Sequence, residues 1–114
     1  MSKGLPQDSL GFLVADLARR MRGAFALHLE GSGLTLAQAR ALLYVARHEG
    51  MRQVELSELL EVQPITLARL IDQLQQSGLV ERRADPKDGR AYRIFLTSAS
   101  GPHLATIERV ASVI

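Results

Sequence analysis

RRADPKDGRAYRIFLT (Arg82–Thr97) is the stretch that decides the predicted fold, because charge and turn signals coincide in it. It holds five of the chain's 14 Lys and Arg residues, gathered around the turn-forming pairs Asp-Pro and Asp-Gly. On either side, residues 79–84 and 91–96 show the short alternating pattern of β-strands. We therefore expect a β-hairpin with a projecting, positively charged loop.

A long amphipathic helix is predicted near the N-terminus, over residues 8–30. Apolar residues recur there at spacings of three and four, the period of one helix face: Leu10, Leu13, Val14, Leu17, Met21 and Phe25. So broad an apolar surface indicates burial against more than one neighbour, with another subunit as a candidate. Gly31-Ser32-Gly33 then breaks the helix and lacks the pattern of a phosphate-binding loop.

Three further helices are predicted between the long helix and the hairpin. A threonine and a glutamine three residues apart have the spacing of a capping box and start the first of them. Proline is tolerated in the first turn of a helix, where its missing N–H would have no partner, and glycine favours a helix end. The predicted helices run from Thr35 to near Gly50, over residues 54–60, and from Pro64 to near Gly78.

The order of these elements is that of a winged helix-turn-helix. In this architecture the second helix of the pair enters the major groove of DNA and presents its N-terminal residues to the bases. Arginine on a narrow projecting loop can reach the minor groove, where A·T-rich stretches concentrate negative potential. The predicted fold is mainly α with a small β-hairpin, flanked by a long N-terminal helix and the start of a C-terminal helix.

Residues 34–101 closely resemble the MarR (multiple antibiotic resistance regulator) family of bacterial transcription factors, particularly its SlyA-like branch. The segments that carry the resemblance are LTLAQARALLYV, LSELLEV, QPITLARLIDQLQQSGLVERR and DPKDGRAYRIFLT followed by SASG. The resemblance implies a homodimer that binds double-stranded DNA at a pseudo-palindromic operator, and the lack of a secretory signal pattern predicts a cytoplasmic protein. It further implies a repressor that a small aromatic acid or phenolic compound releases from DNA.

The same resemblance assigns roles to individual residues. The family contacts bases and phosphates with residues at the start of its recognition helix. The matching positions in this sequence are Gln63, Pro64, Thr66 and Arg69. In the wing, Arg90 matches the arginine that enters the minor groove, and Lys87 could share the contact with phosphates. Asp88 matches the acid that holds a neighbouring arginine.

The wing departs from the family pattern at one position. The usual Asp-Arg-Arg is here Asp88-Gly89-Arg90, which removes the most obvious partner of Asp88. Arg82 or Arg83 on the opposite strand could substitute, and contact with DNA phosphates is the alternative role for both arginines.

Two residues ahead of the third predicted helix are also candidates for the DNA backbone. Arg52 could meet a phosphate through its side chain, and Gln53 through its backbone N–H. A solvated surface position is the alternative for both.

A fifth helix is predicted after Thr97, with Leu104, Ile107, Val110 and Ala111 on one stripe. The dimerisation part of the family usually combines the first helix with two C-terminal helices, so we expect a truncated chain or an unusual subunit interface. In a truncated chain, Leu104, Ile107 and Val110 would be exposed. The predicted divisions are an N-terminal dimerisation helix (1–33), the DNA-binding winged helix-turn-helix (34–97) and the start of a C-terminal dimerisation helix (98–114).

Composition excludes several other classes of protein. A chain of 114 residues is long enough for one domain with its own core, and it has neither a membrane-spanning apolar run nor a secretory signal pattern. Without cysteine there is no disulfide, thiolate nucleophile or thiol redox switch. His28, His48 and His103 lie on separate predicted helices without ligand spacing, so neither a metal nor a cofactor is expected.

Two further functional hypotheses follow from the sequence. The serines have no histidine and acid in a recognisable order, so we predict no enzyme, and the alternative function is a winged-helix protein-interaction module without DNA binding. Steep salt dependence of binding would separate DNA from protein as the partner. The candidate residues for an effector pocket, between the first helix and the winged part, are Met21, Phe25 and Leu29.

Overall fold

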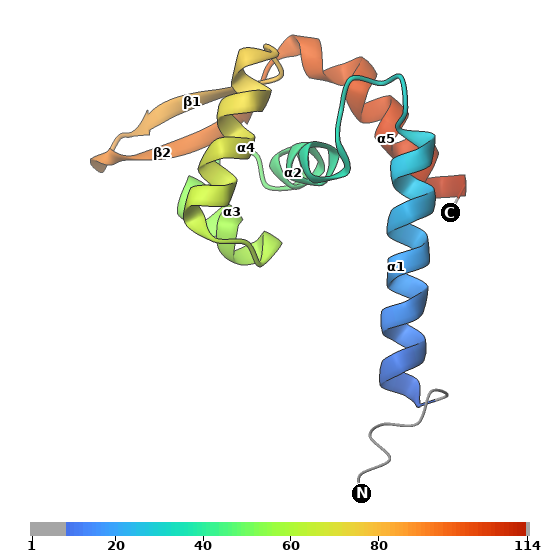
Figure 1. Cartoon of the computed structure of the whole chain (residues 1–114). Coiled ribbons are helices and arrows are strands. Elements are labelled where there is room, and N and C mark those ends of the chain that lie inside the picture. The colour runs from blue at the N-terminus through green and yellow to red at the C-terminus, as the bar shows by residue number, and fades with distance from the viewer. Residues whose placement is uncertain (1–8, 114) are drawn as a thin grey trace, which may run out of the picture.

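Residues 9–113, which the computed structural model describes, form five α-helices and one β-hairpin (Figure 1). A short 3-10 turn precedes the last helix. The elements in chain order are α1 (Leu10–His28), α2 (Leu36–Arg47), α3 (Gln53–Leu60), α4 (Pro64–Gln76), β1 (Val80–Asp85), β2 (Asp88–Leu96), the 3-10 turn (Ser98–Ser100) and α5 (Gly101–Val113). The fold is the mainly α class with a small hairpin that the sequence predicts.

The predicted capping box starts α2. The Oγ1 atom of Thr35 accepts a hydrogen bond of 3.1 Å from the backbone N–H of Gln38. In return, the backbone N–H of Thr35 donates to Oε1 of Gln38 at 3.0 Å. The reciprocal bonds satisfy backbone donors that the start of a helix leaves without partners, so these two residues fix where α2 begins.

Both ends of α4 follow from local sequence signals. Pro64 is its first residue, as predicted. At the other end Gly78 has a φ of +76°, and its N–H donates to the carbonyl of Gln75 at 2.9 Å. The N–H of Leu79 donates to the carbonyl of Leu74, also at 2.9 Å. These two bonds form a Schellman motif, which requires a left-handed residue and so favours glycine at the exit into β1.

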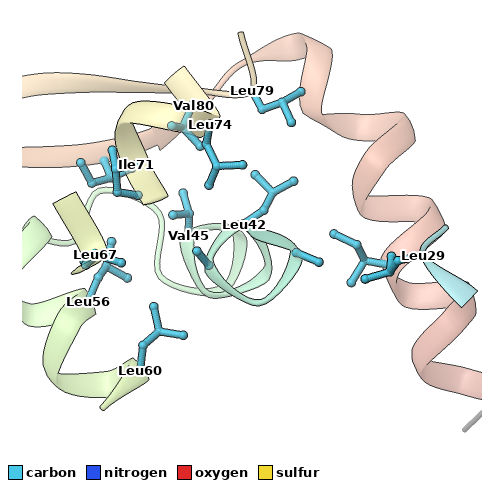
Figure 2. Packing of buried hydrophobic residues seen from close by; sticks show 14 residues of the cluster. Leu29, Leu42, Val45, Leu56, Leu60, Leu67, Ile71, Leu74, Leu79 and Val80 are labelled. Atoms are coloured by element: carbon cyan, nitrogen blue, oxygen red, sulfur yellow. The ribbon is translucent and has the colours of Figure 1, made fainter. Parts of the chain in front are cut away.

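One apolar core holds α2, α3, α4 and the hairpin together (Figure 2). From α4 it takes Leu67, Ile71 and Leu74, which are spaced as one helix face and are at most 1% exposed. The other elements and their connections add Leu42, Val45, Leu56, Leu60, Leu79, Val80 and Ile94. Because α4 and the hairpin share this core, their relative position is fixed.

The hairpin has a tighter turn than the sequence suggests. β1 and β2 pair antiparallel from Val80 opposite Leu96 to Ala84 opposite Tyr92, after which the register is irregular. β2 already begins at Asp88, so only two residues connect the strands. Half of the predicted charged loop, residues 88–90, is therefore part of the second strand.

α1 stands apart from the core and leaves its apolar face uncovered. No residue of α1 is buried, and apart from Phe25, which is half-buried against the core, its large apolar residues are between 44% and 77% exposed: Leu10, Phe12, Leu13, Val14, Leu17, Met21 and Leu27. In Figure 1 only the C-terminal end of α1 lies against the rest of the fold. The radius of gyration is accordingly 16.8 Å, above the ~13 Å of a compact domain of similar size.

α5 differs from its expected state. Ile107 and Val110 are buried, at 1% and 5% exposure, and Leu104 is half-buried against the core. The exposure expected for these residues in a truncated chain is therefore not observed, because α5 packs on α1 and α2 within one subunit. Among residues 9–113, no helix has the length and apolarity needed to cross a membrane.

Candidate nucleic-acid interface

The helix pair and the hairpin lie on the side of the molecule away from α1 (Figure 1). α3 ends at a tight turn in which Glu61 has a φ of +56°. The backbone N–H of Val62 donates to the carbonyl of Ser57 at 3.1 Å, and α4 starts two residues later. α3 and α4 thus form a helix-turn-helix, with the start of α4 at its outer edge.

The first turn of α4 is open to solvent. Gln63 is the N-cap residue, and its side chain makes no capping hydrogen bond. The side chains of Gln63, Pro64 and Thr66 are all exposed, so these three predicted site residues lie together. Backbone N–H groups at the start of a helix lack intrahelical partners and carry partial positive charge, which favours a phosphate there.

Arg69 projects from the outer face of α4. Leu67, Ile71 and Leu74 define the inward side of the helix, and a rotation of about 100° per residue places Arg69 opposite to them. Its side chain is exposed and makes no ion pair with another residue of the described range 9–113. Arg69 is therefore available to an external anion or base.

Arg82 has a different environment, in which its guanidinium is bound within the protein. Its Nη1 atom lies 2.6 Å from Oδ1 of Asp72 and 3.1 Å from Oε1 of Gln75. Nε donates to Oε1 of Gln53 at 2.9 Å, and Nη2 donates to the carbonyl of Ala68 at 3.0 Å. Arg82 thus joins α3, α4 and β1, and both its guanidinium and the side-chain oxygen of Gln53 are bound inside the fold.

The ion pair with Asp88, one of the two roles considered for Arg82 and Arg83, does not form. The strand register places Arg83 opposite Arg93, whereas Asp88 lies beside the turn opposite Asp85. Arg83 pairs instead with Glu81 and lies over the ring of Phe95. Asp88 still supports the wing, since its Oδ1 accepts a hydrogen bond of 3.0 Å from the backbone N–H of Arg90.

Asp85 connects the turn of the wing to Arg52 at the start of α3 and to Arg93 in β2. Its side chain is 1% exposed and accepts hydrogen bonds from Nε of Arg52 at 2.7 Å and from the backbone N–H of Lys87 at 2.9 Å. Nε of Arg93 lies 3.3 Å away. The Lys87 N–H and then the two arginines lower the pKa of Asp85, against the opposing effect of burial. Arg52, a candidate for DNA phosphates, is thus held by Asp85.

The stability that Asp85 contributes is expected to depend on pH. Because its pKa in the folded protein lies below the ordinary 3.8, the contribution is present above that pH and is lost as the pH falls through the lowered pKa. Asp85→Asn should therefore lower the melting temperature by several degrees at neutral pH, and the deficit should shrink on acidification. Circular dichroism melts from neutral pH to about pH 3 measure this. Asp88→Asn, at an exposed acid of the same turn, is the control, and a deficit that is equal at every pH would contradict the prediction.

Similar proteins of known family indicate the role of the exposed helix start and the wing. The model of the MarR family matches residues 32–91, which is more than half of the chain. The chain belongs to the MarR family. The match spans α2, α3, α4 and the turn of the hairpin, the elements that carry the exposed recognition-helix and wing residues. The MarR proteins that it resembles are transcriptional regulators and not enzymes.

Solved MarR structures share the fold over nearly the whole chain. A MarR transcriptional regulator from Methanosarcina mazei Go1 is 31% identical with a TM-score of 0.84, and the match covers 91% of this chain and 75% of that one. A second MarR structure is 30% identical with a TM-score of 0.84, over 99% and 75% of the two chains. A mutant MarR from E. coli complexed with operator DNA is 25% identical with a TM-score of 0.80, over 90% and 73%.

The three residues predicted to line an effector pocket do not all line one hollow in this MarR protein. Met21 and Phe25 line a hollow of about 220 Å³, together with Arg22, Leu36 and Ala111. Leu29 is 2% exposed and belongs to the core, so it does not line the hollow. It follows the last turn of α1, where the chain bends back towards α2 and the leucine turns inward.

Proposed function

We propose that the chain is a bacterial, cytoplasmic repressor that binds a pseudo-palindromic operator as a homodimer. The observation that carries the proposal is the division of the basic residues around α4 and the wing into two sets. Arg52, Arg82, Arg83 and Arg93 are bound to acids or carbonyls of the protein. Arg69, Lys87 and Arg90 are exposed and make no ion pair within residues 9–113.

The residues without ion pairs within residues 9–113, Arg69, Lys87 and Arg90, lie where contact with a DNA duplex requires them. In this proposal the start of α4 enters the major groove, where Gln63, Thr66 and Arg69 meet bases and phosphates. The wing lies along the neighbouring minor groove, with Arg90 inserted and Lys87 at a phosphate. The MarR structure with operator DNA supports this assignment through its shared fold. The bound set holds α4 and the wing in place instead of contacting DNA.

Arg90 should matter most where the minor groove is narrow. A·T-rich flanks narrow that groove and deepen its negative potential, which attracts an inserted arginine. Arg90→Ala is therefore expected to weaken binding by roughly tenfold on A·T-rich flanks and less on G·C-rich flanks, since a contact of this kind contributes about 1 kcal/mol or more. Anisotropy titrations on duplexes that differ only in their flanks measure the difference. Equal losses on both flanks would instead indicate simple phosphate attraction.

The exposed apolar face of α1 supports the proposed homodimer. Soluble monomers rarely leave so many large apolar side chains uncovered along one element. A second α1, with α5 beside it, would cover this face, and twofold symmetry would present two recognition helices about 10 bp apart. Sedimentation equilibrium should give twice the monomer mass for the wild type. A mixture shifted towards monomer is expected for Leu13→Glu, and a wild-type monomer at all concentrations would contradict the dimer.

A small aromatic acid or phenol is the proposed effector. The hollow beside Met21 and Phe25 is almost wholly apolar, and Arg22 at its edge supplies a positive charge for a carboxylate. Salicylate should bind with measurable heat and release the protein from its operator. Phe25→Ala should remove both effects. Calorimetry that shows no heat, together with unchanged DNA binding, would exclude this class of ligand.

Selection from a pool of random duplexes tests the proposed function itself. A sequence-specific homodimer should enrich a pseudo-palindrome whose half-site centres lie about 10 bp apart. Enrichment should disappear for Arg69→Ala and persist for Arg83→Ala, whose arginine pairs with Glu81. A pool that stays random with the wild-type protein would contradict DNA recognition and favour a protein partner.

A further inference from the structure

Ile65 is a large apolar residue in a polar, exposed position. It is the second residue of α4, and 70% of its surface is exposed. Among the exposed large apolar residues in the described part of the chain, only Leu10 on α1 is more exposed. Among the exposed residues near it at the start of α4, Gln63, Thr66 and Arg69 are polar or charged, and only the small ring of Pro64 is apolar.

The fold does not account for an isoleucine at this position. The inward side of α4 is occupied by Leu67, Ile71 and Leu74, and the helical rotation points Ile65 to the opposite side. Isoleucine offers no capping group to a helix start and loses side-chain freedom in a helix. It also lies on α4, far from the apolar face of α1 that a second subunit would cover (Figure 1).

The outward side of α4 also carries Arg69, one helical turn after Ile65. Residues four apart on a helix are neighbours on its surface, so the two side chains approach the same ligand together. One is apolar and the other is a cation with hydrogen-bond donors. On the edges of bases in the major groove the matching groups are the C5-methyl of thymine, which is apolar, and the acceptor atoms of guanine.

We propose that Ile65 reads a thymine methyl group in the major groove, close to the base that Arg69 contacts. The inference rests on the proposed function and adds a specificity-determining residue to it. The helical rise separates the two side chains by about 6 Å along α4, and base pairs stack 3.4 Å apart. The thymine therefore lies within about two base pairs of the Arg69 contact in each half-site.

Deoxyuridine tests this assignment, because it differs from thymidine only in the missing methyl group. The probe is the duplex that the wild-type protein selects from a random pool, with each thymine of the half-site replaced in turn. At one position, replacement should weaken wild-type binding about fourfold per half-site, the ratio that burial of one methyl group corresponds to. Ile65→Ser should bind the thymine and deoxyuridine duplexes equally, and Ile65→Val should keep most of the discrimination.

Each outcome of this experiment separates the inference from the function on which it rests. Equal wild-type affinity for every deoxyuridine duplex would overturn the role of Ile65 while leaving specific DNA binding intact. The same loss in wild type and Ile65→Ser would also overturn it, because another residue would then read the methyl group. A wild-type protein that selects no sequence would overturn the proposed function and this inference together. Circular dichroism should show unchanged folding of Ile65→Ser, since the side chain is exposed.

Discussion

Arg69→Ala is expected to weaken binding to the selected operator by roughly five- to 150-fold, which corresponds to about 1–3 kcal/mol for a side chain that meets a base. The arginine is exposed on the outer face of α4 and has no ion-pair partner within residues 9–113, so its removal should not unfold the protein. The loss should appear on the operator and be much smaller on a scrambled duplex. Fluorescence anisotropy with both duplexes measures it.

Two variants define what the Arg69 result means. Arg69→Lys keeps the charge but loses the planar pair of donors, so it should recover non-specific binding without restoring discrimination. Arg109→Ala removes an exposed arginine from the C-terminal half of α5, a helix that runs from the base of the hairpin away towards α1 (Figure 1), and should change neither affinity. An operator affinity for Arg69→Ala equal to that of the wild type would exclude Arg69 from the interface.

Arg82→Ala is expected to lower the free energy of unfolding by roughly 2–3 kcal/mol, as expected for lost hydrogen bonds to a charged group. The Arg82 side chain is only 17% exposed, and its removal deprives Asp72, Gln53 and the carbonyl of Ala68 of a donor. The orientation of α4 relative to the wing should also loosen. DNA affinity should therefore fall even though Arg82 does not touch DNA.

Arg83→Ala is the matched control, one residue along the same strand. The Arg83 and Glu81 side chains are 57% and 46% exposed, and an exposed pair of this kind contributes about 0–1 kcal/mol. Urea unfolding with linear extrapolation gives the free energy of unfolding for each variant. Equal values for the two variants would show that the Arg82 contacts do not stabilise the fold.

The helix-turn-helix could be predicted because its boundaries depend on local signals. Thr35 with Gln38, Pro64, and Gly78 each satisfy or release backbone groups within a few residues of themselves. The spacing of the inward apolar residues of α4, Leu67, Ile71 and Leu74, is likewise visible in the sequence. Because such signals are local, the sequence predicts the order of the helices and where the recognition helix begins.

The support of the wing could not be predicted, because it depends on contacts distant in sequence. Asp85 meets Arg52 across 33 positions, and Arg82 reaches the carbonyl of Ala68 across 14. Whether a strand arginine faces DNA or α4 is set by register, and one residue of slip reverses it. The predicted loop is also too long, since Asp85 and Asp88 accept N–H groups that stabilise a two-residue turn.

Salt dependence of operator binding tests the central claim most directly. Affinity for the selected operator and for a scrambled duplex would be measured by anisotropy over a series of salt concentrations. The account predicts tighter binding to the operator than to the scrambled duplex. It also predicts that the logarithm of the binding constant falls linearly with the logarithm of the salt concentration. For Lys87→Ala the magnitude of this slope should be about 1 smaller than for the wild type. Equal affinity for the two duplexes, or binding that does not change with salt, would contradict the assignment of α4 and the wing to DNA.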